Sequence, residues 1–211
     1  MLTISSMLET VTIKVGTEGS IYTVHSALLR KRSKFFANAM KPEWSGSLPI
    51  RPPIDLTDED PAIFEIYLHW LYFSALPTKA EGQGNAELDV EFCTLSKCYV
   101  LGEKLMAIGF KNTIIVAFTE AKYEPPRLSH PCPGELPVTI IYKETPENSP
   151  ARKLLVEMWA MYARAEWEHI LVKMPSEFKV DLIRSLVNNR VARWEGIDVK
   201  PYMEVRTPGE S

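Results

Sequence analysis

Histidine is a common metal ligand and proton-transfer group in proteins, and the cysteine thiolate is a nucleophile and a metal ligand. The chain has seven of these residues: His25, His69, His130, His169, Cys93, Cys98 and Cys132. No two histidines have the spacing of a metal-binding pair, and Cys93 and Cys98 match neither a C-x-x-C motif nor an i, i+4 pair. The pattern predicts no metal site, and we expect two core thiols and one exposed thiol, with Cys132 in a loop.

Motifs for covalent catalysis and nucleotide binding are missing from the sequence as well. It contains no G-x-S-x-G elbow, no G-x-x-x-x-G-K-[ST] loop and no G-x-G-x-x-G fingerprint. The acids Asp58, Glu59 and Asp60 are typical of a helix start, where the helix dipole favours negative charge. The sequence therefore predicts a protein without catalytic residues and without a cofactor, although an enzyme of unknown type stays an open alternative.

The densest run of charge is Arg30-Lys31-Arg32-Ser33-Lys34. Such a run can serve as a nuclear-localisation signal or as a phosphate-binding patch. Because it stands within a segment of helical spacing and no second basic cluster reinforces it, we interpret it as the solvated face of a helix. The whole chain has a net charge of −3 and a pI near 5.9, which argues against a nucleic-acid partner.

The composition is that of an ordinary folded protein, with 211 residues of which 45% are apolar and 24% charged. The longest apolar stretch, residues 63–76, is too short and too polar to span a bilayer. The first fifteen residues lack the features of a secretory signal, and three scattered cysteines favour a reducing compartment. We therefore expect an intracellular protein, of the cytoplasm or the nucleus, that does not bind membranes.

The basic run follows a predicted β-hairpin. Residues 11–15 and 21–24 have the β-branched, alternating character of strands, and Gly16 and Gly19 permit the turn between them. After the second strand the spacing of the apolar residues becomes helical. We expect two short helices broken near Ser33, whose side chain can cap the second one.

One short strand and three longer helices are expected next. The strand covers 54–56, and the helices cover 62–73, 90–105 and 108–122. The helix over 62–73 is apolar almost all round, which is typical of a helix buried on several sides. Asp58 or Asp60 can cap it, with Pro61 in its first turn.

The last third of the chain begins with a segment rich in proline. We expect a connector over 125–149, in which the sequence VTIIYK fits one further strand over 138–143. Two helices are expected after the connector, over 150–170 and 176–189, with Ser149 and Ser176 as start signals.

The pattern His-x3-Leu-x3-Ser-x2-Phe, which begins at His25 directly after the hairpin, resembles the start of a BTB/POZ domain. The helix over 62–73 ends in an aromatic cluster similar to that of the family. The resemblance implies an α+β fold, with a small three-stranded sheet flanked by a helical cluster and a mainly helical C-terminal extension. It implies structural roles, as signatures of the fold, for His25, Leu29, Arg32, Ser33, Phe36, Trp70 and Tyr72. The ring of His25 is expected to bond to nearby backbone.

The resemblance also implies a domain organisation. We expect an N-terminal tail over 1–9, a BTB/POZ domain over 10–124, the connector, a helical extension over 150–197 and a tail over 198–211. The whole chain is similar to stand-alone BTB proteins of filamentous fungi. Those proteins often carry a phrase like IYKETPENSPARKLLVEMWA, here at 141–160, followed by a Pro-Glu-Phe-like helix start, here at 175–178.

Two departures from the family pattern bear on self-association. BTB domains usually place an aspartate before the first strand, as partner of a buried basic group. Here that position is Thr10, so Lys31 or Arg32 lacks its acid. The helix face that packs in family dimers carries Arg30 and Lys31, and like charges repel across a two-fold axis. We expect a weak or absent homodimer.

A third departure concerns the cullin scaffold of ubiquitin ligases, which some BTB domains bind through an apolar-x-Glu motif. The matching glutamate is Glu43, but Lys41 stands in the apolar position, so the motif is absent as written.

Trp44 is either an exposed aromatic anchor for a partner or a lid over the core. Lys41, Glu43 and Trp44 are our candidate partner-binding residues. The predicted function is a non-catalytic protein–protein interaction module, and the alternative is a substrate adaptor for a cullin-based ubiquitin ligase.

Overall fold

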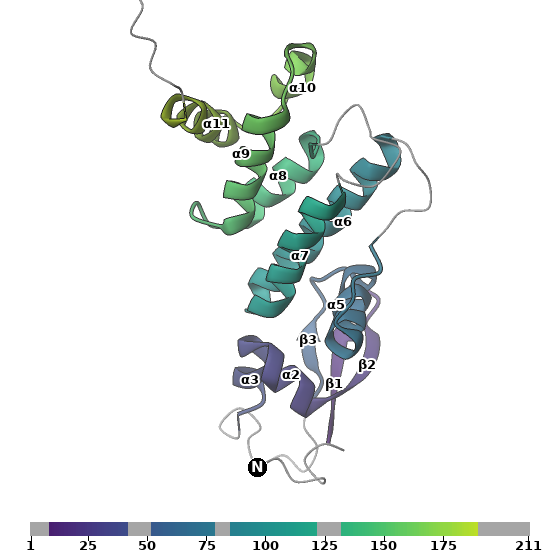
Figure 1. The fold of residues 1–211 in the computed structure, drawn as a ribbon. Coiled ribbons are helices and arrows are strands. Elements are labelled where there is room, and N and C mark those ends of the chain that lie inside the picture. Colours follow the sequence, from purple (N-terminus) through teal and green to yellow (C-terminus); the bar gives the residue numbers. More distant parts are fainter. Residues whose placement is uncertain (1–8, 42–51, 79–84, 122–131, 190–211) are drawn as a thin grey trace, which may run out of the picture.

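The computed structural model describes residues 9–41, 52–78, 85–121 and 132–189. Its elements are β1 (Thr10–Val15), β2 (Ser20–His25), α2 (Ser26–Arg32), α3 (Lys34–Ala39), β3 (Ile54–Leu56), α5 (Pro61–Phe73), α6 (Asn85–Lys104), α7 (Ile108–Ala121), α8 (Glu135–Glu144), α9 (Pro150–Tyr162), η1 (Ala165–Trp167), α10 (Glu168–Leu171) and α11 (Ser176–Asn188). Figure 1 shows the sheet with α2, α3 and α5 at one end, α6 and α7 in the middle, and α8 to α11 at the other end.

The sheet has three strands in the order β2-β1-β3. β1 and β2 form the predicted antiparallel hairpin, and β3 pairs with β1 in parallel over its three residues. Gly16 and Gly19 both have positive φ angles, 75° and 74°, a backbone region that glycine enters without steric cost. The turn between the strands therefore forms as its glycines predict.

The two short helices after the hairpin break at Ser33, as expected. Ser33 has an extended backbone, and its hydroxyl oxygen accepts a hydrogen bond from the Phe36 N–H, which caps α3. The same hydroxyl donates to the carbonyl oxygen of Leu105 over 2.6 Å. Ser33 thus ends α2 through its backbone, and its side chain starts α3 and fixes that helix to the turn after α6.

Helix α5 begins at the predicted cap. The Asp60 carboxylate accepts from the Ala62 N–H, and Pro61 occupies the first turn. The helix buries residues on more than one side, among them Phe64, Tyr67 and Leu71. It ends at Ser74, which adopts the left-handed conformation at φ 55°.

The prediction of a strand over 138–143 is wrong, because these residues belong to helix α8 (Glu135–Glu144). Its β-branched run favours a strand by local propensity, but Val138, Ile141 and Tyr142 recur at helical spacing and are buried. Burial of that face in the shared core outweighs the weak local preference. Pro137 is tolerated because it lies in the first turn, where its missing N–H would have no partner within the helix.

The prediction of a single helix over 150–170 is also wrong for the second half of that range. α9 ends at Tyr162, and Ala163 is extended at ψ 144°. The chain then turns through η1 and α10, which places the Trp167 ring edge-on to Trp159 with a centroid separation of 6.0 Å. The start of α9 at Pro150 is as predicted, but the Ser149 hydroxyl makes no cap and donates instead to the Tyr99 hydroxyl.

One hydrophobic core runs through all the parts of the molecule. It includes Ile13 of the sheet, Phe64 of α5, Phe92 of α6, Phe118 of α7 and Leu155 of α9, all fully buried. The helices after residue 132 therefore complete the same core as the sheet end.

Candidate interaction surface

A groove of about 430 Å³ lies where α2 and α3 meet α5 and the turn between α6 and α7. Its lining comes from three separate parts of the sequence. The lining residues are Arg30, Lys31, Arg32, Ser33, Lys34, Ala37, Trp70, Met106, Ile108 and Gly109. We call this site the basic groove. Its volume lies within the range of about 300–1,000 Å³ that is typical of ligand pockets.

The turn after α6 forms one wall of the basic groove. The Ala107 N–H donates to the Gly102 carbonyl and the Met106 N–H to the Glu103 carbonyl, a Schellman pattern that satisfies the last carbonyls of the helix. Met106 takes the left-handed position, at φ 49°, where glycine is usual. A large apolar side chain in this strained position is 42% exposed at the rim of the groove.

Trp70 lines the apolar part of the groove. Its indole N–H donates to the Thr113 hydroxyl over 3.0 Å, which fixes the ring against α7. The Arg32 guanidinium lies 4.9 Å from the ring centroid, in cation–π geometry, and donates to the Ser74 hydroxyl. Arg32 is thus held by neutral groups. This arrangement supplies the missing partner of Arg32 without an acid.

The four cations of the basic groove are poorly compensated. Arg30 pairs with Glu9 at 3.5 Å, with both side chains about half exposed, so the pair is weak. Lys31 and Lys34 are exposed and form no ion pair with any residue that the structure describes. None of the described lining residues is acidic. The groove therefore presents positive charge beside an apolar surface.

The predicted fold-signature residues divide into two groups. Leu29 and Phe36 are fully buried, and Ser33 is nearly so, as expected for core positions. The ring of His25, expected to bond to nearby backbone, instead makes a hydrogen bond of 2.8 Å from its Nδ1 to the Tyr72 hydroxyl. The backbone N–H of His25 donates to the same hydroxyl. His25 and Tyr72 tie the end of the hairpin to α5.

The candidate partner-binding residues Lys41, Glu43 and Trp44 follow α3 in the sequence. Lys41 is exposed at the end of the described segment 9–41. Glu43 and Trp44 lie outside the described residues, so their part in binding stays a prediction.

The sequence alone indicated a solvated helix face for the basic run and gave no sign that Met106 and Ile108 line the same groove. A methionine where a helix end favours glycine is the signal that could have drawn attention to this turn.

The cysteines are arranged differently from the prediction. Cys132, expected to be exposed, is 1% exposed, and its thiol donates to the Met158 carbonyl oxygen. Cys98 is fully buried, and this burial raises the pKa of its thiol to about 12. Cys93 is partly exposed. Across the described ranges, no three His, Cys, Asp or Glu side chains gather closely enough to hold a metal ion.

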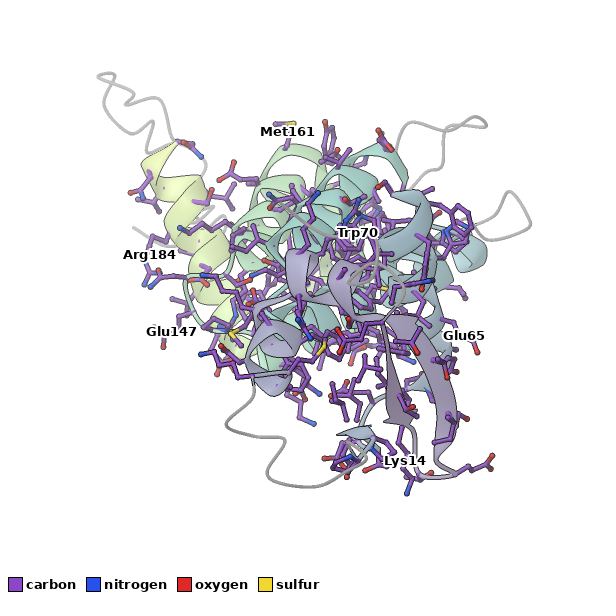
Figure 2. The ribbon with its side chains drawn as sticks, turned by 90° about the horizontal axis from the view of Figure 1, so that it is seen from below. Lys14, Glu65, Trp70, Glu147, Met161 and Arg184 are labelled. Atoms are coloured by element: carbon purple, nitrogen blue, oxygen red, sulfur yellow. The ribbon has the colours of Figure 1, made fainter. Side chains whose placement is uncertain are left out.

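A second and larger groove, of about 910 Å³, lies between α9 and α11. Its lining carries charges of both signs. Among its residues, Arg184 pairs with Asp181 at 2.7 Å, the Ser185 hydroxyl donates to Glu157, and Asp181 also accepts from the Tyr142 hydroxyl. We call this site the extension groove. Figure 2 shows Glu147 and Arg184, two of its lining residues, on the α11 side of the molecule.

The comparison with protein families agrees with this architecture. Residues 5–93 match the model of the BTB/POZ domain family, from before the first strand into α6. The chain therefore contains a BTB/POZ domain, with the three-stranded sheet and helices of an α+β BTB fold and a helical extension after it. The comparison with curated proteins found no match to the chain. In the described parts of the chain, no helix combines the length and the apolar character needed to cross a membrane.

BTB/POZ domains are in general protein–protein interaction modules and not enzymes. Among the described residues, the basic groove gathers positive charge beside apolar side chains without an acidic lining residue. Most of its lining belongs to the matched range, and Met106, Ile108 and Gly109 follow that range, so we treat the groove as the candidate site for a partner.

Proposed function

We propose that this protein is a non-catalytic interaction module that binds a protein partner at the basic groove. The observation that carries the proposal is the set of four cations around one apolar groove with no acid among the described lining residues. Like charges on one surface repel one another, which raises the electrostatic free energy of the isolated protein. A partner of opposite charge removes that repulsion when it docks.

We also propose that the module is monomeric, or at most weakly dimeric. In an isologous contact the same face of both copies meets, so Arg30, Lys31 and Lys34 of one copy would face the same set of cations on the other. That repulsion disfavours a symmetric dimer through the basic groove. Light scattering at micromolar concentration tests this: a stable dimer mass contradicts it.

The adaptor role in a cullin-based ubiquitin ligase is our second candidate. The feature that favours it is the packed extension of α8 to α11, which offers a groove for a substrate on the side of α11. Against it stands Lys41, where the cullin-binding motif has an apolar residue. A mixture with a cullin N-terminal domain that gives a complex of defined mass by light scattering would reverse this ranking.

Two finer predictions rest on the sequence. The phrase at 141–160 and the helix start at 175–178 support a relationship to stand-alone fungal BTB proteins. The cysteine usage supports an intracellular site of action, in the cytoplasm or the nucleus.

The experiment compares three tagged forms of the full chain in pull-downs analysed by mass spectrometry. They are the wild type, the groove variant Lys31→Glu/Lys34→Glu and the control variant Arg164→Glu/Lys173→Glu, which makes the same charge change at exposed positions of the extension. Partners that bind the wild type and the control but not the groove variant support the proposal. A partner set that the groove variant retains in full refutes it.

A further inference from the structure

We propose that the partner of the basic groove is a short acidic peptide segment in which aspartate or glutamate residues flank one exposed apolar side chain. This inference rests on the proposed function and specifies the chemistry of the partner. It follows from the charges, the apolar surface and the geometry of the groove, taken in turn below.

The charges select an anionic partner. Arg30, Lys31 and Arg32 come from the last turn of α2, and Lys34 comes from the start of α3. They surround one groove, although the chain as a whole has a net charge of −3. The positive potential is thus local to this site. Lys31 and Lys34, which pair with no acid in the described segments, are the cations free to meet carboxylates.

The apolar surface selects a peptide with a side chain to bury. Met106 and Ile108 are 42% and 56% exposed and line the same groove as Trp70. Burying part of that surface against an apolar side chain contributes about 25 cal/mol per Å² of area removed from water. A simple anion such as phosphate would satisfy the cations and leave these side chains exposed.

The geometry supports a preformed site. The Ser33 hydroxyl and the backbone N–H of Phe35 both donate to the Leu105 carbonyl oxygen, which joins the start of α3 to the wall that carries Met106. Trp70 is fixed by its bond to Thr113. Because both walls are already held by hydrogen bonds, the protein loses little conformational entropy when a segment docks there.

A second copy of this chain is a weaker candidate for the groove. The symmetric contact brings cation to cation, and the acids of the extension groove are mixed with the cations Arg152, Lys153 and Arg184. The observations therefore favour a separate acidic segment over self-association.

The test uses fluorescence anisotropy with the full chain and a labelled peptide of sequence Ser-Glu-Glu-Leu-Glu-Glu-Ser. Two further peptides replace the glutamates by glutamine or the leucine by serine. We expect saturable binding of the first peptide that weakens with added salt. The Lys31→Glu/Lys34→Glu variant should lower its affinity at least about tenfold, since loss of two charge pairs of roughly 0.7 kcal/mol each amounts to that factor. The Arg164→Glu/Lys173→Glu control should bind as the wild type does.

Met106→Ala gives a second, independent variant, because it removes apolar contact and leaves the charges unchanged. We expect it to weaken the leucine peptide more than the serine peptide. Circular dichroism and thermal melts establish that each variant is folded before its affinity is compared. Equal binding of the glutamate and glutamine peptides, or unchanged affinity in the groove variant, overturns the inference.

The outcomes also separate this inference from the proposed function. If pull-downs lose partners with the groove variant but the acidic peptide does not bind, the groove is an interaction site for another chemistry, and only the acidic-peptide inference fails. If labelled single-stranded DNA binds more tightly than the peptide and competes with it, the partner is a nucleic acid and the inference fails as well. If neither peptide binding nor partner capture depends on the groove, both proposals fail.

Discussion

The two grooves of this protein differ in how their charges are balanced. The basic groove has four cations, one weak pair to Glu9 and no acid in its described lining. The extension groove is larger and carries charges of both signs, with Arg184 paired to Asp181 and Glu157 accepting a hydrogen bond from Ser185. In the first groove the positive charge is left for a partner, whereas in the second groove cations and acids lie side by side.

The buried cation Arg152 sharpens this difference. It reaches from α9 to the end of α8, where its guanidinium donates to Thr145 and to the carbonyl oxygens of Tyr142 and Thr145. It also lies 4.6 Å from the centroid of the Tyr142 ring. An arginine on the extension side therefore completes the carbonyl ends of α8, while the arginine and lysine side chains of the basic groove remain at the surface. For substitutions of the charged side chains, the comparison predicts stability effects in the extension and binding effects in the domain.

The largest stability effect is expected from Arg152→Ala. The substitution leaves buried carbonyl groups at the end of α8 without their donor and opens space beside Tyr142. We expect the free energy of unfolding to fall by about 3 kcal/mol. Chemical denaturation of the full chain measures this value. Arg152→Lys keeps the charge but not the planar set of donors, so an intermediate loss is expected. If Arg152→Ala unfolds at the wild-type midpoint, the cation has no structural role.

A smaller loss is expected from Ser33→Ala, which lies under the basic groove. The substitution removes the cap of α3 and the hydrogen bond to Leu105, each contributing about 1 kcal/mol, so we expect a loss of about 2 kcal/mol. Ser176→Ala is the matched control, because Ser176 starts a helix at an exposed position without capping it. Denaturation midpoints of the two variants compare the positions directly, and equal midpoints contradict the role of Ser33.

Met106→Gly should stabilise the protein, by about 0.5–1 kcal/mol. Glycine adopts the left-handed backbone at this helix end without the strain that methionine carries. Met106→Ala keeps the strain and serves as the control, with no gain expected. Thermal melts measure the shift. A lower melting temperature for Met106→Gly would mean that the methionine side chain stabilises the fold and is not held at the rim for another purpose.

The smallest stability effect is expected from the charge reversals. Lys31→Glu/Lys34→Glu changes only exposed side chains without ion pairs in the described structure, so its free energy of unfolding should stay within about 0.5 kcal/mol of the wild type. The control Arg164→Glu/Lys173→Glu should show an equally small change. A large loss in the groove variant alone would show that the basic run supports the fold, and would remove the contrast between the two grooves.

Local signals in the sequence were sufficient for the hairpin and for the starts of several helices. Gly16 and Gly19 permit the turn by their backbone freedom, and Ser33, Asp60 and Pro61 mark helix starts through hydrogen bonds or fixed φ angles within a few residues. These features depend on neighbours along the chain. They were therefore predictable before any fold was known, as was the BTB-like pattern from His25 to Phe36.

The features that the sequence did not reveal depend on contacts between distant segments. Residues 138–143 have strand-like composition and become helical because α8 buries Val138 and Ile141 in the shared core. The bend after Tyr162 places Trp167 against Trp159, and the basic groove needs Lys31, Trp70 and Met106 to come together from separate segments. Hydrophobic burial acts between surfaces that only the fold makes adjacent. Tertiary structure alone therefore decided where the uncompensated charge and the exposed apolar surface coincide.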